Sequence, residues 1–362
     1  MDTYCEQERD TTSPSITRVG IVMGGVSSEK EISLESGRNI FSKLPKKWYE
    51  PIPLFMDESS QIWRIPLKLV MRNSTADIKA DLEHEAMIIP YENLKNEVDI
   101  IYIALHGKYG EDGCFQGLLE LLRIPYVGSG VLASAVGMKK DVSRKILACA
   151  GIDVPKTVLI DAYAWEHDSP DCMRRIEAEP GYPCVVKPSR EGCSTAVAKV
   201  VSPEGIPLAL EKALLWDNEV LVEEFLHGME VTCGVIGNED PMALTPSETI
   251  PTAEVLSLED KFLYGQGENK TPARLPGETL AAIQDTAIRT FKTLGLKVYA
   301  RIDMFAADGG RIVVLEPNSL PGMTPSTVLF HQAAASGINQ SELMDRIIRY
   351  SFEAHRTKKG PL

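Results

Sequence analysis

The sequence predicts a mixed α/β protein with more than one domain. Its 362 residues are too many for one ordinary hydrophobic core, so two or three domains are expected. Near the N-terminus, residues 18–44 read as a buried strand, a glycine turn and a helix, which is the first unit of a doubly wound fold. Near the C-terminus, residues 300–322 read as two short apolar strands joined by a turn at Asp308-Gly309-Gly310.

Composition excludes several classes of protein. Hydrophobic residues make up 44% of the chain and charged residues 25%, which is typical of soluble globular proteins. No apolar run is long enough to span a membrane, and the net charge of −13 argues against a nucleic-acid partner. The seven cysteines lack the paired spacing of a zinc site or a disulfide framework, which indicates the reducing cytoplasm. Residues 1–17 are polar and acidic, so we expect a disordered tail and no secretory signal.

The glycine turn of the first unit lies where ligands bind in a doubly wound sheet. We expect the helix after it to open at Ser27 and Ser28, with Glu29 and Glu31 in its first turn. The turn lacks the G-x-G-x-x-G pattern, so the sequence does not support dinucleotide binding. Further strands are expected at residues 51–56 and 87–91.

His106 follows another buried strand, at residues 98–105, and precedes a loop rich in glycine and charge. The carboxyl end of such a strand is the functional edge of the sheet. The alternative is a histidine whose ring is satisfied by a turn carbonyl. A short helix and a Pro-Gly-rich exit follow, and they indicate a first domain boundary near residue 128.

The middle of the chain predicts a helix and a phosphate-binding hairpin. Residues 131–150 have helical periodicity and carry Lys139, Lys140, Arg144 and Lys145. A charged helix face of this kind is usually solvated. Residues 183–201 read as a strand, a Gly-Ser turn and a returning strand, which can fold over phosphates with Lys187 and backbone N–H groups as donors. The P-loop pattern is absent.

Residues 219–236 read as two strands that carry acids around a turn at Gly228. Glu223, Glu224 and Glu230 could accept from an adenine amino group and a ribose hydroxyl; solvation at a strand edge is the alternative. Residues 251–275 are polar and too long for an ordinary connection, so we expect a lid or a disordered segment. Helices are expected at residues 277–296 and 341–352.

The hairpin at residues 300–322 indicates a metal site. Side chains alternate along a strand, so Arg301 and Asp303 share one face, Glu316 and Asn318 share another, and pairing can make the two faces one. Carboxylate and amide oxygens at this density suit a hard cation such as Mg²⁺. The alternative is a surface hairpin whose acids are solvated.

Taken together, seven stretches in order resemble the ATP-grasp superfamily and, within it, the D-alanine–D-alanine ligase family. They are GGVSSEKEIS, LHGKYGEDGCFQG, IPYVGSGVLASAVGMKK, VVKPSREG, EEFLHGMEVT, RIDMF and LEPNSLPGMTPS. The resemblance covers about residues 18–352. It implies a Rossmann-like domain at 18–128, a central ATP-grasp subdomain at 129–227, and a C-terminal one at 228–362 that includes the lid at 251–275. ATP would bind between the last two.

The resemblance also implies roles for individual residues. It places ATP contacts at Lys140, Lys187, Glu191, Cys193, Ser194, Glu223, Leu226 and Glu230. It places the ligands of two Mg²⁺ ions, for which Mn²⁺ can substitute, at Asp303, Glu316 and Asn318. It places catalytic roles at Glu29, Arg301, Gly322, Lys261 and Ser194, and substrate contacts at Glu29, His106, Phe262 and Thr327. In this scheme Glu29 holds the ammonium of the first D-alanine, while Arg301 and the Gly322 amide stabilise an oxyanion.

The implied activity is ATP-dependent formation of D-alanyl-D-alanine for peptidoglycan, through a D-alanyl phosphate, by a cytoplasmic homodimer with no nucleic-acid or membrane partner. Three positions depart from the family's pattern. The phosphate loop reads Gly192-Cys193-Ser194-Thr195-Ala196 where Gly-Ser-Ser-x-Gly is usual, the lid has Phe262 in place of tyrosine, and the second subsite has Thr327 in place of serine. Two alternatives stay open, namely a D-alanine–D-lactate ligase and a non-catalytic nucleotide-binding protein. Retention of Lys187, Arg301 and the three metal-site residues argues against the second.

Overall fold

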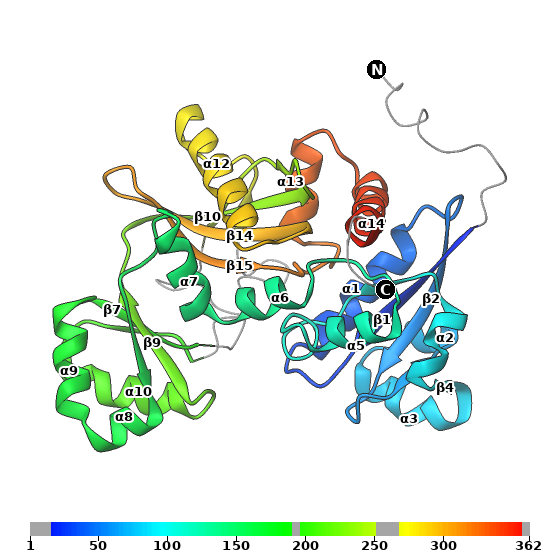
Figure 1. Ribbon diagram of the computed structural model, residues 1–362, viewed down its shortest axis with the longest axis horizontal. Helices are drawn as coiled ribbons and strands as arrows, with labels where there is room; N and C mark the ends of the chain where they lie inside the picture. Colours follow the sequence, from blue (N-terminus) through cyan, green and yellow to red (C-terminus); the bar gives the residue numbers. More distant parts are fainter. Residues whose placement is uncertain (1–15, 190–195, 251–267, 357–362) are drawn as a thin grey trace.

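The computed structural model describes residues 16–189, 196–250 and 268–356, which form three β-sheets with flanking helices (Figure 1). The sheets lie within residues 17–103, 157–224 and 228–318. The mixed α/β class predicted from the sequence is confirmed. Five residues with predicted roles lie outside the described residues: Glu191, Cys193, Ser194, Lys261 and Phe262.

The first sheet has the strand order β4-β3-β2-β1-β5. Its strands are β1 (Thr17–Gly24), β2 (Tyr49–Met56), β3 (Ile62–Arg64), β4 (Met87–Ile89) and β5 (Ile100–Ile103). Its helices are α1 (Lys30–Lys43), α2 (Leu67–Val70), α3 (Thr75–Glu85), α4 (Leu94–Glu97) and α5 (Cys114–Leu122). β1 is parallel to β2 and to β5, so the carboxyl ends of β1 and β5 meet at one edge of the sheet. The glycine turn and His106 therefore lie at the same edge.

Three boundaries in this region differ from the sequence prediction. Thr17 belongs to β1 and not to the tail, because its N–H donates to the Trp48 carbonyl at 3.1 Å. β5 ends at Ile103, before His106. α1 begins at Lys30, and Ser27 does not cap it. The Ser27 hydroxyl instead donates to the His106 carbonyl at 2.7 Å and accepts the Glu29 N–H at 3.1 Å, which ties the helix start to the end of β5.

The second sheet is antiparallel with the order β6-β9-β7-β8. Its strands are β6 (Thr157–Asp161), β7 (Cys184–Pro188), β8 (Ala198–Val200) and β9 (Glu219–Glu224), and its helices are α8 (Ala162–His167), α9 (Ser169–Ala178) and α10 (Ile206–Leu214). β7 and β8 pair as the predicted hairpin, and Lys187 follows the last of these pairs, at the end of the hairpin nearest the turn. This sheet has its own core, which is formed by side chains of its strands, α9 and α10.

The predicted single helix at residues 131–150 is wrong. The chain forms two helices, α6 (Val131–Met138) and α7 (Lys140–Cys149), which are interrupted at Lys139 with φ −92° and ψ 92°. Gly137 weakens the helix immediately before the break. Lys139 pairs with Glu219 of β9 at 3.1 Å, whereas Lys140 pairs with Glu316 of β15 at 3.1 Å, so the break lets neighbouring lysines reach different sheets.

The third sheet has the order β13-β12-β10-β14-β15, and β11 pairs with β10. Its strands are β10 (Gly228–Gly237), β11 (Met242–Ala243), β12 (Ser247–Ile250), β13 (Glu268–Lys270), β14 (Val298–Ala307) and β15 (Ile312–Asn318), and its helices are α12 (Gly277–Thr293), α13 (Val328–Ala335) and α14 (Gln340–Arg356). The predicted hairpin is confirmed as β14–β15, and its turn uses positive φ at Gly309 (81°) and Gly310 (84°). Of the segment expected as a lid, residues 251–267 lie outside the described residues, and residues 268–275 contain β13.

The C-terminal helix α14 joins the first and third sheets. Its buried side chains, including Leu343, Ile347 and Ile348, belong to the same hydrophobic core as Val19 and Ile40 of the first sheet and its helix. Tyr49 Oη donates to Asp345 at 2.8 Å across this contact. Figure 1 shows α14 beside α1 and β1. Within the described part of the chain, none of the helices combines the length and hydropathy that crossing a membrane requires.

Candidate active site

The β14–β15 hairpin brings the four predicted polar residues together on one face. Asp303 pairs with Glu316 across the two strands, and Arg301 pairs with Asn318 two residues further along. Arg301 donates from Nε and Nη2 to the two carboxylate oxygens of Asp303, both at 2.9 Å. Thr232 of the neighbouring strand β10 donates its hydroxyl to Asp303 Oδ1 at 2.6 Å. The acids of this hairpin are therefore part of a built polar cluster, which rules out the alternative of a solvated surface hairpin.

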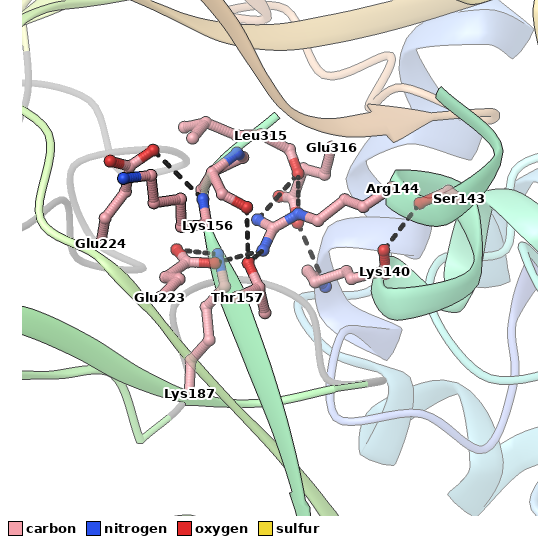
Figure 2. Close-up of polar contacts among 11 residues, drawn as sticks. Lys140, Ser143, Arg144, Lys156, Thr157, Lys187, Glu223, Glu224, Leu315 and Glu316 are labelled. Carbon is pink, nitrogen blue, oxygen red and sulfur yellow. Dashed lines mark hydrogen bonds and ion pairs between the residues drawn. The ribbon is translucent and has the colours of Figure 1, made fainter. Parts of the chain in front are cut away.

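The helix α7 supplies two cations that face the same region (Figure 2). Lys140 Nζ lies 3.1 Å from Glu316 Oε2. One turn later, Arg144 donates from Nε and Nη2 to the Leu315 carbonyl at 3.1 and 3.0 Å, and from Nη1 to the Glu223 carboxylate. Both side chains are buried. The expectation of a solvated charged face is thus wrong for Lys140 and Arg144, and it holds for Lys145, whose side chain is 71% exposed.

Glu223 lies between two cations in the interior. Lys187 Nζ is 2.7 Å from Glu223 Oε1, and Arg144 holds the other carboxylate oxygen (Figure 2). Burial works to raise the pKa of Glu223, but Arg144 and Lys187 outweigh it and lower that pKa below its ordinary value. Burial lowers the pKa of Lys187, and the positive charges of Arg144 and Lys140 add to this effect, while Glu223 opposes it. The molecule thus concentrates cations here despite its overall charge of −13.

His106 and Glu29 meet at the carboxyl edge of the first sheet. Gly107 has φ 63°, and a Cβ built at this position would lie 3.2 Å from Glu29 Oε2, so a glycine allows the His106 loop to approach the start of α1. The His106 ring lies between two side chains, with Nε2 2.9 Å from Ser36 Oγ and Nδ1 3.4 Å from Glu111 Oε1. The alternative of a ring satisfied by a turn carbonyl is not what these contacts show.

The loop after β15 is held by two residues of α1. The Met323 N–H donates to Ser36 Oγ at 3.1 Å, and Asn39 Nδ2 donates to the Met323 carbonyl at 2.8 Å. All three residues are buried, and Met323 is more than 280 residues away from Ser36 and from Asn39 in the sequence. Because Met323 follows Gly322 directly, this clamp fixes the peptide next to the predicted oxyanion amide.

Two small cavities lie on either side of Arg301. The first encloses about 60 Å³ between the first and third sheets. The predicted residues that line it are Glu29, His106, Lys140, Arg301, Glu316, Asn318 and Gly322. The second encloses about 40 Å³, and its predicted lining residues are Glu230, Arg301, Asp303 and Thr327. Each cavity admits only a small polar molecule, and the Arg301 guanidinium is common to both.

The hairpin fits a divalent cation by its donor set. Two carboxylates, of Asp303 and Glu316, face the same side, and Oδ1 of Asn318 is buried without a hydrogen-bond partner among the described residues. A buried acceptor without a donor is costly unless a cation or another group completes it. Among the described residues no group of three or more His, Cys, Asp or Glu is arranged to hold a metal, so a cation held here would need the asparagine oxygen as a third protein donor.

Several contacting residues were not predicted from the sequence. Arg144 was assigned to a solvated face, and Ser36, Asn39 and Thr232 were not singled out. The buried face of α1 contains Ser33, Ser36 and Asn39 next to leucine and isoleucine. Polar residues repeated at helical spacing on an apolar face are the one sequence signal that would have indicated α1 as part of the site.

The fold and these cavities define an ATP-grasp enzyme, in which two antiparallel sheets, joined through α7, enclose a cluster of buried cations. Family models for the N-terminus and the C-terminus of D-Ala–D-Ala ligase match residues 18–129 and 146–349. The chain therefore belongs to the D-alanine–D-alanine ligase family, whose members are ATP-dependent ligases that form a C–N bond.

Individual relatives agree over almost the whole chain. A D-alanine–D-alanine ligase from Geobacillus thermodenitrificans is 35% identical over 354 residues, which is 95% of this chain and 97% of the relative. The VanG D-Ala:D-Ser ligase from Enterococcus faecalis superposes with a TM-score of 0.82 at 29% identity, covering 93% of this chain and all of that one. A D-alanine–D-alanine ligase from Bacillus anthracis complexed with ATP has a TM-score of 0.71 at 31% identity, covering 95% and 100%.

Proposed function

We propose that this chain joins two molecules of D-alanine at the expense of ATP. The observation that carries the proposal is the position of Arg301 between two small polar cavities. One cavity offers Glu29 for an ammonium group and the Gly322 backbone, and the other offers Thr327 for a second carboxylate. A bond formed between two small zwitterions would lie next to the one guanidinium that lines both cavities.

ATP activates the first substrate because a carboxylate is a poor acyl donor. A carboxylate oxygen of the first D-alanine attacks the γ-phosphorus, ADP leaves, and a D-alanyl phosphate results. We assign Lys140 and Lys187 to the phosphates of ATP, and Glu223, Leu226 and Glu230 to its base and ribose. The buried cations support this assignment, because an anionic substrate would otherwise meet an acidic molecule.

The second D-alanine then completes the reaction. Its neutral amine attacks the acyl carbon, so the C–N bond forms and the carbonyl oxygen becomes an oxyanion. The oxyanion then collapses, the bond between the acyl carbon and the phosphate oxygen breaks, and the nitrogen loses a proton to the departing phosphate or to solvent. We assign the stabilisation of that oxyanion to Arg301 and the Gly322 N–H, and the assignment is supported by the presence of both residues in the lining of the first cavity. Ser36 and Asn39 hold the adjacent residue, Met323, at its N–H and at its carbonyl, so the Gly322 amide does not have to reorganise during the reaction.

Asp303, Glu316 and Asn318 would hold Mg²⁺ or Mn²⁺, and the cation would neutralise charge on the transferring phosphate. The protein's own residues prepare the site without it, since Arg301 and Lys140 pair with the two carboxylates. Use of the dipeptide in peptidoglycan, a cytoplasmic location and a homodimer belong to the same proposal.

The test is a chromatographic assay of product and ADP from ATP, Mg²⁺ and D-alanine. We expect D-alanyl-D-alanine and ADP in equal amounts, and no ADP without D-alanine. ATP hydrolysis without dipeptide would contradict the proposal. No nucleotide turnover at all would also contradict it and would leave the non-catalytic alternative.

A D-alanine–D-lactate ligase is the second candidate, because Phe262 replaces the tyrosine expected in the lid. The fold likeness to a D-Ala:D-Ser ligase adds D-serine as a substrate to try. Mixed reactions of D-alanine with D-lactate or D-serine, between acid and alkaline pH, separate these possibilities. Depsipeptide should increase as pH falls, because ammonium is not a nucleophile while the hydroxyl group is unaffected. Absence of depsipeptide at every pH, with no effect of Phe262→Tyr, would exclude this candidate.

A further inference from the structure

Arg144 is the one residue of α7 whose side chain contacts both sheets that enclose the proposed nucleotide site. Its Nε and Nη2 donate to the Leu315 carbonyl of β15 at 3.1 and 3.0 Å. Its Nη1 donates to the Glu223 carboxylate of β9 and to Thr157 Oγ1 of β6 at 3.1 Å. Figure 2 shows the guanidinium between these groups. Leu315 immediately precedes Glu316, and Glu223 contacts Lys187, so Arg144 contacts the neighbours of both a proposed metal ligand and a proposed phosphate ligand.

The geometry requires an arginine. The guanidinium is planar and carries donors on two edges, so it can bind a carbonyl on one side and a carboxylate on the other in a single orientation. The side chain is 4% exposed, and that of Glu223 is 6% exposed. A lysine has one nitrogen and can satisfy one of these two partners in full, but not both.

The charge balance explains what this contact does for the site. Glu223 shares its two oxygens between Arg144 and Lys187. If Arg144 were neutral, Lys187 would be left to neutralise the buried carboxylate, because an unpaired buried charge is strongly disfavoured. Its ammonium would then be held more tightly by Glu223 and would be less available to a phosphate. The same change would remove the two Arg144 donors from the Leu315 carbonyl, while β15 would stay paired with β14.

We propose that Arg144 is a positioning residue of the nucleotide site, and this inference rests on the proposed function. It keeps Glu223 neutralised from the far side, so that Lys187 can turn toward phosphate oxygens. It also keeps β15 at a fixed distance from β9. Arg144 does not itself touch ATP in this account.

Arg311 offers a matched control. It joins the same two sheets, because it binds Asp153 at 2.9 and 3.1 Å and Glu224 of β9 at 3.3 Å from the turn after β14. Its side chain is 42% exposed, and the proposed function assigns neither Asp153 nor Glu224 to ATP, to the metal or to D-alanine. Arg311→Met therefore removes an ionic link between the sheets without changing the charge around Lys187.

The experiment compares full-length Arg144→Met, Arg144→Lys and Arg311→Met with wild type. The measurements are the KM values for ATP and D-alanine, kcat, nucleotide affinity by calorimetry, and Tm without nucleotide. We expect Arg144→Met to raise the KM and the dissociation constant for ATP by about tenfold or more, which corresponds to about 1.4 kcal/mol of lost coupling. The KM for the first D-alanine should stay within about twofold of wild type, since the first cavity does not include Arg144. Arg144→Lys should recover part of the loss, and Arg311→Met should match wild type in all kinetic constants.

A double variant tests the route of the effect. If Arg144 acts through Glu223, adding Arg144→Met to Glu223→Gln should cost less ATP affinity than it costs in wild type. Full additivity of the two losses in ATP affinity would overturn the proposal. Equal changes in the KM values for ATP and D-alanine, or the same kinetic constants for Arg144→Met and Arg311→Met, would overturn it as well. If Arg144→Met does not fold, the test is made with Arg144→Lys alone. An unchanged KM for ATP in Arg144→Lys would contradict the argument that the residue must bind both the Leu315 carbonyl and the Glu223 carboxylate. A wild-type protein without ATP-dependent turnover or ATP binding would instead refute the proposed function.

Discussion

Replacing Lys187 by methionine separates a phosphate-binding lysine from a structural one. Methionine has a similar length and no charge, so it fills most of the same space. Lys187 lies 2.7 Å from Glu223, which is buried, and the Lys187 side chain is 14% exposed. A buried carboxylate left without a partner would destabilise the fold by about 3–5 kcal/mol. Here Arg144 still holds the other oxygen of Glu223, so no unpaired charge results.

The stability loss should therefore be that of one charged hydrogen bond, about 1.5–3 kcal/mol. Burial already lowers the pKa of Lys187, which means that the ammonium carries a desolvation cost that its removal recovers, and the lower end of that range is expected. Loss of a charged partner for bound phosphate costs about 2–5 kcal/mol, and 2 kcal/mol corresponds to roughly a thirtyfold weaker affinity for ATP. The effect on binding should exceed the effect on folding.

The assay measures Tm with and without ATP, together with ATP affinity by calorimetry. Wild type should gain Tm on adding ATP, as a ligand that binds only the folded state requires, and Lys187→Met should gain much less. Lys212→Met is the control, since it removes an exposed lysine of α10 and should leave both quantities unchanged. A large fall in Tm without nucleotide, with ATP affinity intact, would refute the reasoning and make Lys187 structural.

Three further predictions follow from the same contacts. Glu316→Gln removes one charge from the proposed metal site and should lower the rate of ADP release by orders of magnitude at saturating ATP; near wild-type turnover would refute the metal assignment. Because the pKa of Glu223 is lowered from its ordinary value of 4.5, its carboxylate stabilises the fold at pH values above 4.5. The difference in unfolding free energy between wild type and Glu223→Gln should therefore be full at neutral pH and shrink as the pH falls below 4.5. A difference that does not depend on pH would contradict this. Asn39→Leu leaves the buried Met323 carbonyl unpaired, which should cost about 1–3 kcal/mol in unfolding and lower kcat without changing the KM for ATP; equal kcat would show that the clamp does not position Gly322.

The hairpin of β14 and β15 was predictable because strand periodicity is local. Residues two apart on a strand lie on the same face, so the sequence alone could place Arg301 beside Asp303 and Glu316 beside Asn318. The observed register then puts Arg301 opposite Asn318 and Asp303 opposite Glu316. His106 was also placed at the correct edge, although β5 ends two residues earlier than expected. In both cases the deciding information lies within a few residues of the side chain concerned.

The contacts that complete the site were decided by the tertiary structure. Helical periodicity could not show that α6 and α7 are separate, because the break at Lys139 depends on Glu219 and Glu316, which lie in two different sheets. It could not show that Arg144 is buried, since a charged residue is solvated unless the fold supplies a carboxylate and a carbonyl together, here from positions 79 and 171 residues away. The hydrogen bonds of Ser36 and Asn39 to Met323 were likewise not predictable, because more than 280 residues separate the partners in the sequence. Whether a charged side chain is buried and paired depends on contacts between segments that are far apart in the sequence. The residues next to that side chain in the sequence do not determine those contacts.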